Sequence, residues 1–198
     1  MPPPRRQRLD VEERRQSILE RAGALFAEQT YAEVSVAQVA RASGASPALV
    51  FHYFDNKAGL YTALVERTVE DLLARQHAAD TALPEGSSTR DRVRTSLLVY
   101  LDHIAEHPKA WASPLMGGAE PPKASELRRQ ARTDYVGRLE ALLHPTGGVR
   151  HHFALWGYFG FVDAACLDWV LRGCDPDERH PLVDAALGAL EGALGDWG

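Results

Sequence analysis

The apolar residues of this chain recur at every third or fourth position rather than at every second one. Near the N-terminus, Ile18, Ala22 and Phe26 form one such stripe, which predicts a helix over about 11–28. No stretch alternates β-branched and polar residues over the length of a strand. We therefore expect an all-α fold.

Two short helices are predicted next, each with its own N-terminal capping signal. Ser35 is followed three residues later by Gln38, which is the capping-box pattern, so a helix should follow over about 36–42. A Ser-Gly-Ala sequence ends that helix. Ser46 then precedes a proline, the residue type favoured at the first helical position, and this predicts a helix over about 47–54.

Helical periodicity continues to the C-terminus, and Pro and Gly residues mark its interruptions. Asn56 caps a long helix, which a linker rich in Pro, Gly and Ser follows at 83–89. Asp175 and Pro176 open the last helix. The remaining helices are expected at about 90–107, 123–144, 149–173 and 175–194, with a short helix or loop over 108–122. The prediction is about nine helices, short at the front and long behind.

The composition is that of an ordinary folded chain, with 45% hydrophobic and 25% charged residues among 198. A chain of this length can bury a core without a disulfide or a metal. Cys166 and Cys174, expected in one helix, would lie about 12 Å apart, too far for a disulfide, which favours buried thiols. Because we find no run of about 18 apolar residues and no secretory signal, we expect a cytoplasmic protein with no membrane partner.

The net charge of −5 is unevenly distributed along the chain. Residues 1–60 carry eight Lys or Arg and seven Asp or Glu, whereas the remainder carries 14 and 20. A polyanion such as nucleic acid would therefore bind at the N-terminal end, although an excess of one positive charge is a small signal by itself.

Short helices with a tight break between the second and third form the pattern of a helix-turn-helix. In the third helix, Val50 and Phe54 share a face that can pack against the other two. Ala48 and His52 are rotated by about 200° and face outward, with Pro47 at the tip. This small surface suits contact with thymine methyl groups and one hydrogen bond from the imidazole. The alternatives are a helical hairpin that binds no DNA and a plain surface histidine.

Residues 14–65, above all SGASPALVFHYFDNKAGL at 43–60, resemble the DNA-binding domain of the TetR family of bacterial transcriptional regulators. The glycine turn, the serine cap, the Phe-His-Tyr-Phe run and Lys57 all stand at the family's spacing. The resemblance implies a homodimer that binds a palindromic double-stranded DNA operator. It also implies a helix-turn-helix domain with a basic N-terminal arm over 1–56, and a helical domain over 57–198 that dimerises, binds a small-molecule effector and then releases the DNA.

The resemblance also assigns roles to single residues. Ser35 and Lys57 match positions that contact phosphates, and Tyr53 matches a position that touches the DNA backbone. Phe51 replaces a usual tyrosine and Ala37 replaces a longer polar side chain, so those two contacts are lost. The losses favour an arginine arm that enters the minor groove, although a solvated tail is the alternative. The base-facing residues are Ala45, Ser46, Pro47, Ala48 and His52, and the arm contains Arg5, Arg6 and Arg8.

The last two long helices each carry a stripe of small residues. Glycine inside a helix costs about 0.5–1 kcal/mol relative to alanine, so repeated glycines need a compensation such as close backbone approach. In the family these helices form the dimer interface; the alternative is close packing inside one subunit. The stripe consists of Ala154, Gly157, Gly160, Ala164, Ala185, Gly188, Ala189 and Gly192.

Aromatic and histidine side chains mark the candidate effector cavity, although aromatic residues at helical spacing are often plain core residues. His103 and His107 have a spacing that can bind zinc, but we find no third ligand and expect neither a metal nor a cofactor. The candidate ligand-binding residues are Tyr100, His103, His107, Trp111, Met116, Tyr135, Phe153, Trp156 and Phe159.

The sequence therefore predicts a ligand-responsive regulator, most simply a repressor, that binds DNA as a dimer. The rival is a helical-bundle small-molecule-binding protein or enzyme that does not bind DNA. Motif spacing assembles no Ser-His-Asp or Cys-His constellation and no phosphate-binding glycine loop, so we do not expect an enzyme.

Overall fold

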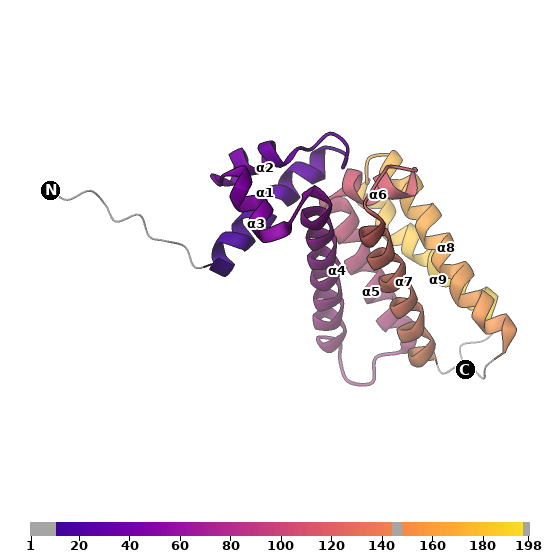
Figure 1. The fold of residues 1–198 in the computed structure, drawn as a ribbon. Coiled ribbons are helices and arrows are strands. Elements are labelled where there is room, and N and C mark those ends of the chain that lie inside the picture. The colour runs from indigo at the N-terminus through magenta and orange to yellow at the C-terminus, as the bar shows by residue number, and fades with distance from the viewer. Residues whose placement is uncertain (1–10, 144–147, 196–198) are drawn as a thin grey trace.

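The computed structural model describes residues 11–143 and 148–195, and over these ranges the fold is all-α, as predicted (Figure 1). The described residues form nine α-helices and one 3₁₀ turn, with no strand among them. The elements are α1 (Val11–Glu28), α2 (Val36–Ser43), α3 (Pro47–Phe54), α4 (Lys57–Thr81), α5 (Thr89–Glu106), α6 (Pro108–Leu115), α7 (Pro122–Leu143), α8 (Val149–Leu171), η1 (Pro176–Glu178) and α9 (Arg179–Leu194).

The last helix begins later than predicted. The Asp-Pro-Asp-Glu sequence forms the separate 3₁₀ turn η1, in which the Asp175 carboxylate accepts a hydrogen bond from the Asp177 N–H at 2.9 Å. Helix α9 then starts at Arg179. A side-chain cap and a proline in the first position suit the start of a 3₁₀-helix as well as that of an α-helix. These signals therefore located the first turn but did not show that it is a 3₁₀ turn.

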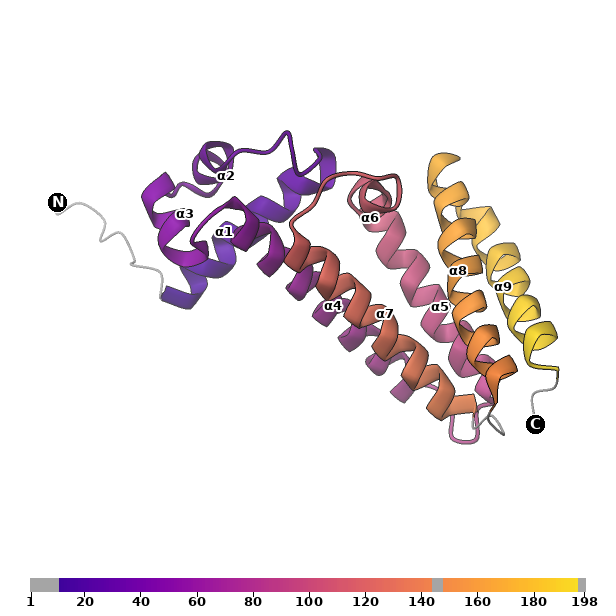
Figure 2. The same cartoon turned by 45° about the vertical axis from the view of Figure 1, so that its right-hand side comes forward.

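Helices α1, α2 and α3 form a head at one end of the molecule (Figure 2). Its hydrophobic core contains Ile18, Phe26, Val39, Val50 and Phe54, none more than 4% exposed. The inward face that helical spacing predicts for the third helix is therefore confirmed.

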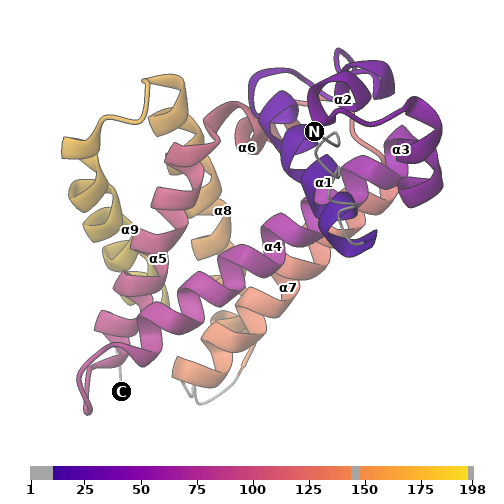
Figure 3. The same cartoon turned by 90° about the vertical axis from the view of Figure 1, so that its left-hand side faces the viewer.

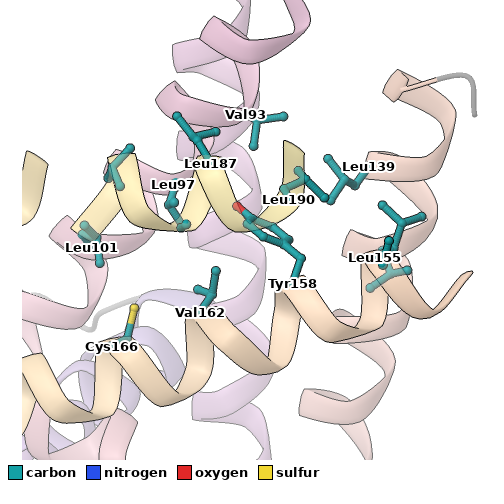
Figure 4. Close-up of a cluster of buried hydrophobic side chains, with 14 of the residues drawn as sticks. Val93, Leu97, Leu101, Leu139, Leu155, Tyr158, Val162, Cys166, Leu187 and Leu190 are labelled. Carbon is teal, nitrogen blue, oxygen red and sulfur yellow. The ribbon is translucent and has the colours of Figure 1, made fainter. Parts of the chain in front are cut away.

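The rest of the chain forms a helical body, in which α4 packs against α5 and α7, and α8 packs against α9 (Figure 3). Its core gathers side chains from α5, α7, α8 and α9, among them Leu101, Tyr158 and Leu187 (Figure 4). Trp169 is 1% exposed, and its indole N–H donates to the carbonyl of Asp175 at 2.9 Å. That hydrogen bond satisfies the buried polar atom and fixes the turn after α8.

Helix α4 belongs to both the head and the body. Leu60 and Val65 are buried in the core of the head, whereas Leu72 faces the body. The head also takes apolar residues from α7, because Ala124 is fully buried in its core and Leu127 packs against it. Two long helices therefore hold the head, and the domain boundary drawn from the sequence stays a prediction.

Cys174 does not lie in the same helix as Cys166. Helix α8 ends at Leu171, and Cys174 adopts a left-handed conformation (φ 58°) in the turn that follows. The prediction that both cysteines lie in one helix was therefore wrong, although both thiols are free. Burial raises the pKa of the fully buried Cys166 to about 12, and it also raises the pKa of the half-buried Cys174.

Helix α8 is long and apolar enough, by length and composition alone, to cross a membrane, and it is the one such helix in the described residues. Its sequence contains no unbroken apolar run of that length, although the mean hydropathy over 18 residues reaches 1.2. One side of α8 packs against α9. The exposed residues of α8 include the large apolar side chains of Phe153, Phe161 and Leu171.

Candidate DNA-binding surface and regulatory cavity

A capping box and a glycine set the turn between α2 and α3. The Ser35 hydroxyl accepts from the Gln38 N–H at 3.3 Å, and the Gln38 carboxamide oxygen accepts from the Ser35 N–H at 2.6 Å. At the far end of α2, Gly44 has a left-handed backbone (φ 63°), which glycine adopts without steric cost. The Ala45 N–H then donates to the carbonyl of Ala40 at 2.9 Å. These backbone bonds fix the direction in which α3 leaves the turn.

Helix α3 presents a small exposed face. Ser46 caps the helix through its side chain, and Pro47 is the first helical residue. Ala48 and His52 are exposed, as the helical spacing predicts, and Phe51 beside them is 46% exposed. The exposed face of the helix thus offers apolar contacts and one imidazole, which is a shape that fits a major groove.

Lys57 is the first residue of α4 and lies shortly after the C-terminal end of α3. Asn56 caps α4 by accepting from the Gly59 N–H at 2.9 Å, and a Cβ at Gly59 would collide with the last carbonyl of α3. The Lys57 ammonium lies 4.4 Å from the centre of the Tyr31 ring and donates to the carbonyl of Ala32 at 3.4 Å. The sequence pointed to Lys57 but gave no sign of Tyr31, because nothing local links the two residues.

The predicted DNA-facing residues lie on α3, in the turn before it and at the N-terminal ends of α2 and α4. The Tyr53 ring contacts the edge of the His52 ring, with the ring centres 5.4 Å apart. The residues of the expected arm, Arg5, Arg6 and Arg8, lie outside the described part of the chain. Ser35, Ser46, Pro47, Ala48 and His52 are exposed, and Ala45, Tyr53 and Lys57 are half-buried.

A cavity of about 150 Å³ lies within the body, lined by residues of α4, α5, α6, α7 and α8. Helix α4 contributes aliphatic side chains such as Val69, Leu72 and Leu73, which the sequence analysis did not single out. Five of the nine candidate ligand-binding residues line this cavity, namely Tyr100, His103, Trp111, Tyr135 and Phe159.

The other four candidates lie elsewhere. His107 follows the end of α5 with φ −141° and lines a neighbouring cavity between α1, α4 and α6. Met116, after α6, is 56% exposed, and Phe153, on the outer side of α8, is 67% exposed. Trp156 is half-buried, with its ring centre 6.4 Å from that of His152. His107 and Met116 lie just beyond helix ends, and for Phe153 and Trp156 the pattern did not show which side of α8 faces the cavity.

A pair of charged residues, missed by the sequence analysis, also lines the cavity. The Arg132 Nη2 donates to the Asp163 Oδ2 at 2.7 Å, and the guanidinium lies 5.0 Å from the centre of the Phe159 ring. Burial raises the pKa of Asp163, and the guanidinium of Arg132 opposes that rise. The two residues are 31 positions apart on α7 and α8, so no local spacing indicates the pair.

His103 is buried where α5 faces the cavity. Loss of hydration lowers its pKa to about 4, and the charges of Arg75 and His107 act in the same direction. The imidazole is therefore neutral at pH 7, and its buried Nδ1 has no hydrogen-bond partner. Elsewhere on the wall, the Trp111 indole N–H donates to the Tyr100 hydroxyl at 2.8 Å, which fixes both rings.

The small-residue stripe lies on the surface of α8 and α9. An added Cβ at Gly157, Gly160, Gly188 or Gly192 would meet no atom within 4 Å, so close packing of these glycines inside one subunit is excluded. Ala154 differs from the others, because it is 6% exposed and faces the core of the body. The remaining residues, Gly157, Gly160, Ala164, Ala185, Gly188, Ala189 and Gly192, are exposed or half-buried.

Comparison with known proteins agrees with this geometry. Residues 18–64 match the sequence profile of the tetR family of bacterial regulatory proteins. A tetR-family transcriptional regulator from Streptomyces coelicolor is 25% identical and superposes with a TM-score of 0.76, covering 93% of this chain and 80% of that one. This chain belongs to the TetR family. The regulator FadR of Bacillus subtilis, solved in complex with stearoyl-CoA, shares the TetR fold at 17% identity, with a TM-score of 0.70 over 90% of this chain and 97% of that one.

Two curated relatives match part of this TetR-family chain. The transcriptional activator FasR of Mycolicibacterium smegmatis is 29% identical over 100 residues, which are 50% of this chain and 44% of FasR. The transcriptional regulator BetI of Rhizobium meliloti is 30% identical over 118 residues, which are 59% of this chain and 56% of BetI. The chain thus spans about half the length of these relatives.

Proposed function

We propose that this TetR-family protein is a cytoplasmic transcriptional repressor that binds a palindromic operator as a homodimer. A small molecule in the cavity of the body releases the operator. The exposed face of α3 carries the proposal: Ala48 and His52 point outward, while Val50 and Phe54 anchor the helix in the core of the head. A buried anchor and a small outward face are what a helix needs to enter the major groove.

Phosphate contacts would hold α3 in the groove. Ser35 and Lys57 lie at the N-terminal ends of α2 and α4, where free backbone N–H groups and the helix dipole favour an anion. Phe51 cannot donate to a phosphate, but its exposed ring suits contact with a thymine methyl group. The N-terminal arginines would add contacts in the minor groove.

The outer faces of α8 and α9 support dimerisation. Phe153, Phe161 and Leu171 are 67%, 38% and 66% exposed on α8, among glycines whose missing side chains leave the backbone open. A partner that approaches this surface closely would bury the apolar side chains and offset the helical cost of the glycines. The dimer would place two copies of α3 about 34–36 Å apart, the spacing of successive major grooves.

Helix α4 is the means by which the cavity would act on the head. Val69 and Leu72 line the cavity, and Leu60, earlier on the same helix, is buried in the core of the head. A ligand that presses on α4 would therefore shift the head. Helix α6 provides a second link, because Trp111 lines the cavity and Lys109 donates to Glu28 of α1 at 2.9 Å. A coupling energy of about 1–3 kcal/mol would weaken operator binding about 5–150-fold.

The rival function, a small-molecule-binding protein or enzyme that does not bind DNA, makes use of the same cavity. The two functions differ in what the head does, so DNA binding is the property to measure. We expect a duplex selected from a random pool to be palindromic and to bind about 1,000-fold or more tighter than a scrambled duplex, by fluorescence anisotropy.

Lys57→Ala should weaken operator binding and reduce the slope of log affinity against log salt by about one per protomer, because one phosphate contact is lost. Arg129→Ala, which removes the same charge from an exposed position on α7, serves as the control and should leave the slope unchanged. A protein that prefers no palindrome over random DNA, or a Lys57→Ala variant with the slope of the wild type, would contradict the proposal.

A further inference from the structure

The cavity of the body contains polar atoms that no protein group satisfies. Among the described residues, His103 Nδ1 and Arg132 Nε are buried and have no hydrogen-bond partner, and both residues line this one cavity. A buried polar group without a partner destabilises the fold, so their concentration at one place indicates a site shaped for a polar ligand.

The charges on the cavity wall favour an anion. Three arginines and one carboxylate line it, although the whole chain has a net charge of −5. Arg128 is neutralised by Glu120 at 3.2 Å, a residue whose side chain is 9% exposed, and Arg132 is paired with Asp163. Arg138 makes no ion pair with any described residue and lies 5.9 Å from the centre of the Tyr135 ring. Arg138 is exposed, so water screens its charge, and the preference of the cavity for an anion rests mainly on the buried edge of Arg132.

Arg132 is the group best placed to bind that anion. Its Nη2 is used by Asp163, while Nε is buried and free. The Phe159 ring lies 5.0 Å from the guanidinium carbon and limits its rotation. An arginine held in this way offers its Nε edge to a carboxylate at little entropic cost, since planar N–H groups and carboxylate oxygens match in geometry.

The apolar walls fix the size and shape of the rest of the ligand. Trp111 and Tyr100 pack edge to face with ring centres 6.2 Å apart, as do Tyr135 and Phe159 at 5.6 Å. The cavity volume of about 150 Å³ matches the space that one aromatic ring occupies. Rings that meet edge to face also suit an aromatic guest better than a flexible chain.

We propose, resting on the function proposed above, that the effector is a small aromatic carboxylate whose ring lies between Trp111 and Phe159 and whose carboxylate accepts a hydrogen bond from the Arg132 Nε. Asp163 holds the guanidinium in place. His103, neutral and unpaired at Nδ1, contacts a polar substituent of the ring.

Three probes with the same ring and nearly the same length test the charge: phenylacetate, phenylacetamide and phenethylamine. Binding to the dimer without DNA is measured by isothermal titration calorimetry. We expect phenylacetate to bind at least about tenfold tighter than phenylacetamide, with phenethylamine weakest, because a hydrogen bond between charged groups exceeds a neutral one. Equal affinities for the acid and the amide, tighter binding of the amine, or no binding of any probe up to about 10 mM would overturn the proposal.

Variants of the ion pair locate the anion site. Asp163→Asn should increase the preference for the acid over the amide, because Arg132 loses its competitor. Arg132→Gln leaves a buried carboxylate alone and is prone to unfold, so the double variant Arg132→Gln/Asp163→Asn is the decisive one. It should bind the amide as the wild type does and lose the preference for the acid. A double variant that still prefers the acid to the amide would overturn the proposal. Arg129→Gln is the control on the same helix, and loss of the preference in this variant would also overturn the proposal.

Decanoate separates a ring from a chain, and tighter binding of decanoate than of phenylacetate would overturn the aromatic part of the proposal. Operator release is measured separately, by anisotropy with phenylacetate present. Acid-selective binding without release supports the ligand class and contradicts the switching mechanism. Release by some other compound, with no binding of phenylacetate, contradicts the ligand class and leaves the switch intact.

Discussion

The buried imidazole of His103 links the stability of the body to pH. Its pKa is lowered to about 4 by burial and by Arg75 and His107, while Glu106 opposes the change. An unfolded chain protonates this histidine near pH 6.5, so between pH 4 and 6.5 the unfolded state binds more protons. The contribution of the neutral imidazole to the free energy of unfolding is fully present above pH 6.5. It is lost as the pH falls toward 4.

His103→Leu removes this proton-linked loss. Between pH 7.5 and pH 4.5, we expect the free energy of unfolding to fall by about 2–3 kcal/mol more in the wild type than in the variant. Urea denaturation followed by circular dichroism at the two pH values measures the difference. Parallel pH profiles for the two proteins would show that His103 is not the titrating group.

At the scale of elements, α8 and α9 are unusual because their outer faces combine glycines with exposed apolar residues. Gly188→Asp would place a charge in the middle of that surface, where the protomer itself has open space. We expect the variant to fold and to be a monomer in sedimentation velocity at micromolar concentration, because an interface cannot bury an unpaired carboxylate at low cost.

Gly137→Asp is the matched control for this prediction. Gly137 is an exposed glycine within α7, and a Cβ there also meets no atom within 4 Å. The Gly137→Asp variant should remain dimeric, although it replaces a glycine within a helix and adds one negative charge, as Gly188→Asp does. If both variants kept the oligomeric state of the wild type, the α8–α9 surface would not be the interface.

The elements that the sequence predicted well are those with local signals. Ser35 and Gln38 located the start of α2, and Ser46 located that of α3, because a cap involves residues three positions apart. The face of α3 followed from the helical period alone. The pairing of Arg132 with Asp163 could not be predicted, because it depends on how two helices pack and not on spacing along either one.

At the scale of the whole molecule, the cavity and the head share α4, so a larger side chain in the cavity should act as a ligand does. Val69→Phe places a ring against α4 from inside the body. We expect it to weaken operator binding about 5–150-fold in the absence of any effector, as measured by fluorescence anisotropy. Ala74→Phe, on the exposed side of the same helix, should leave the affinity near that of the wild type. Equal effects of the two variants would rule out transmission through the cavity.

The burial of Ala124 in the core of the head has a practical consequence for chimeric regulators. A graft that transfers only α1, α2 and α3 onto another sensory domain would leave behind the first turn of α7. The head would then lose part of its own hydrophobic core. Reprogramming the operator choice of this protein is therefore better done by exchanging the outward residues of α3 than by transplanting the head.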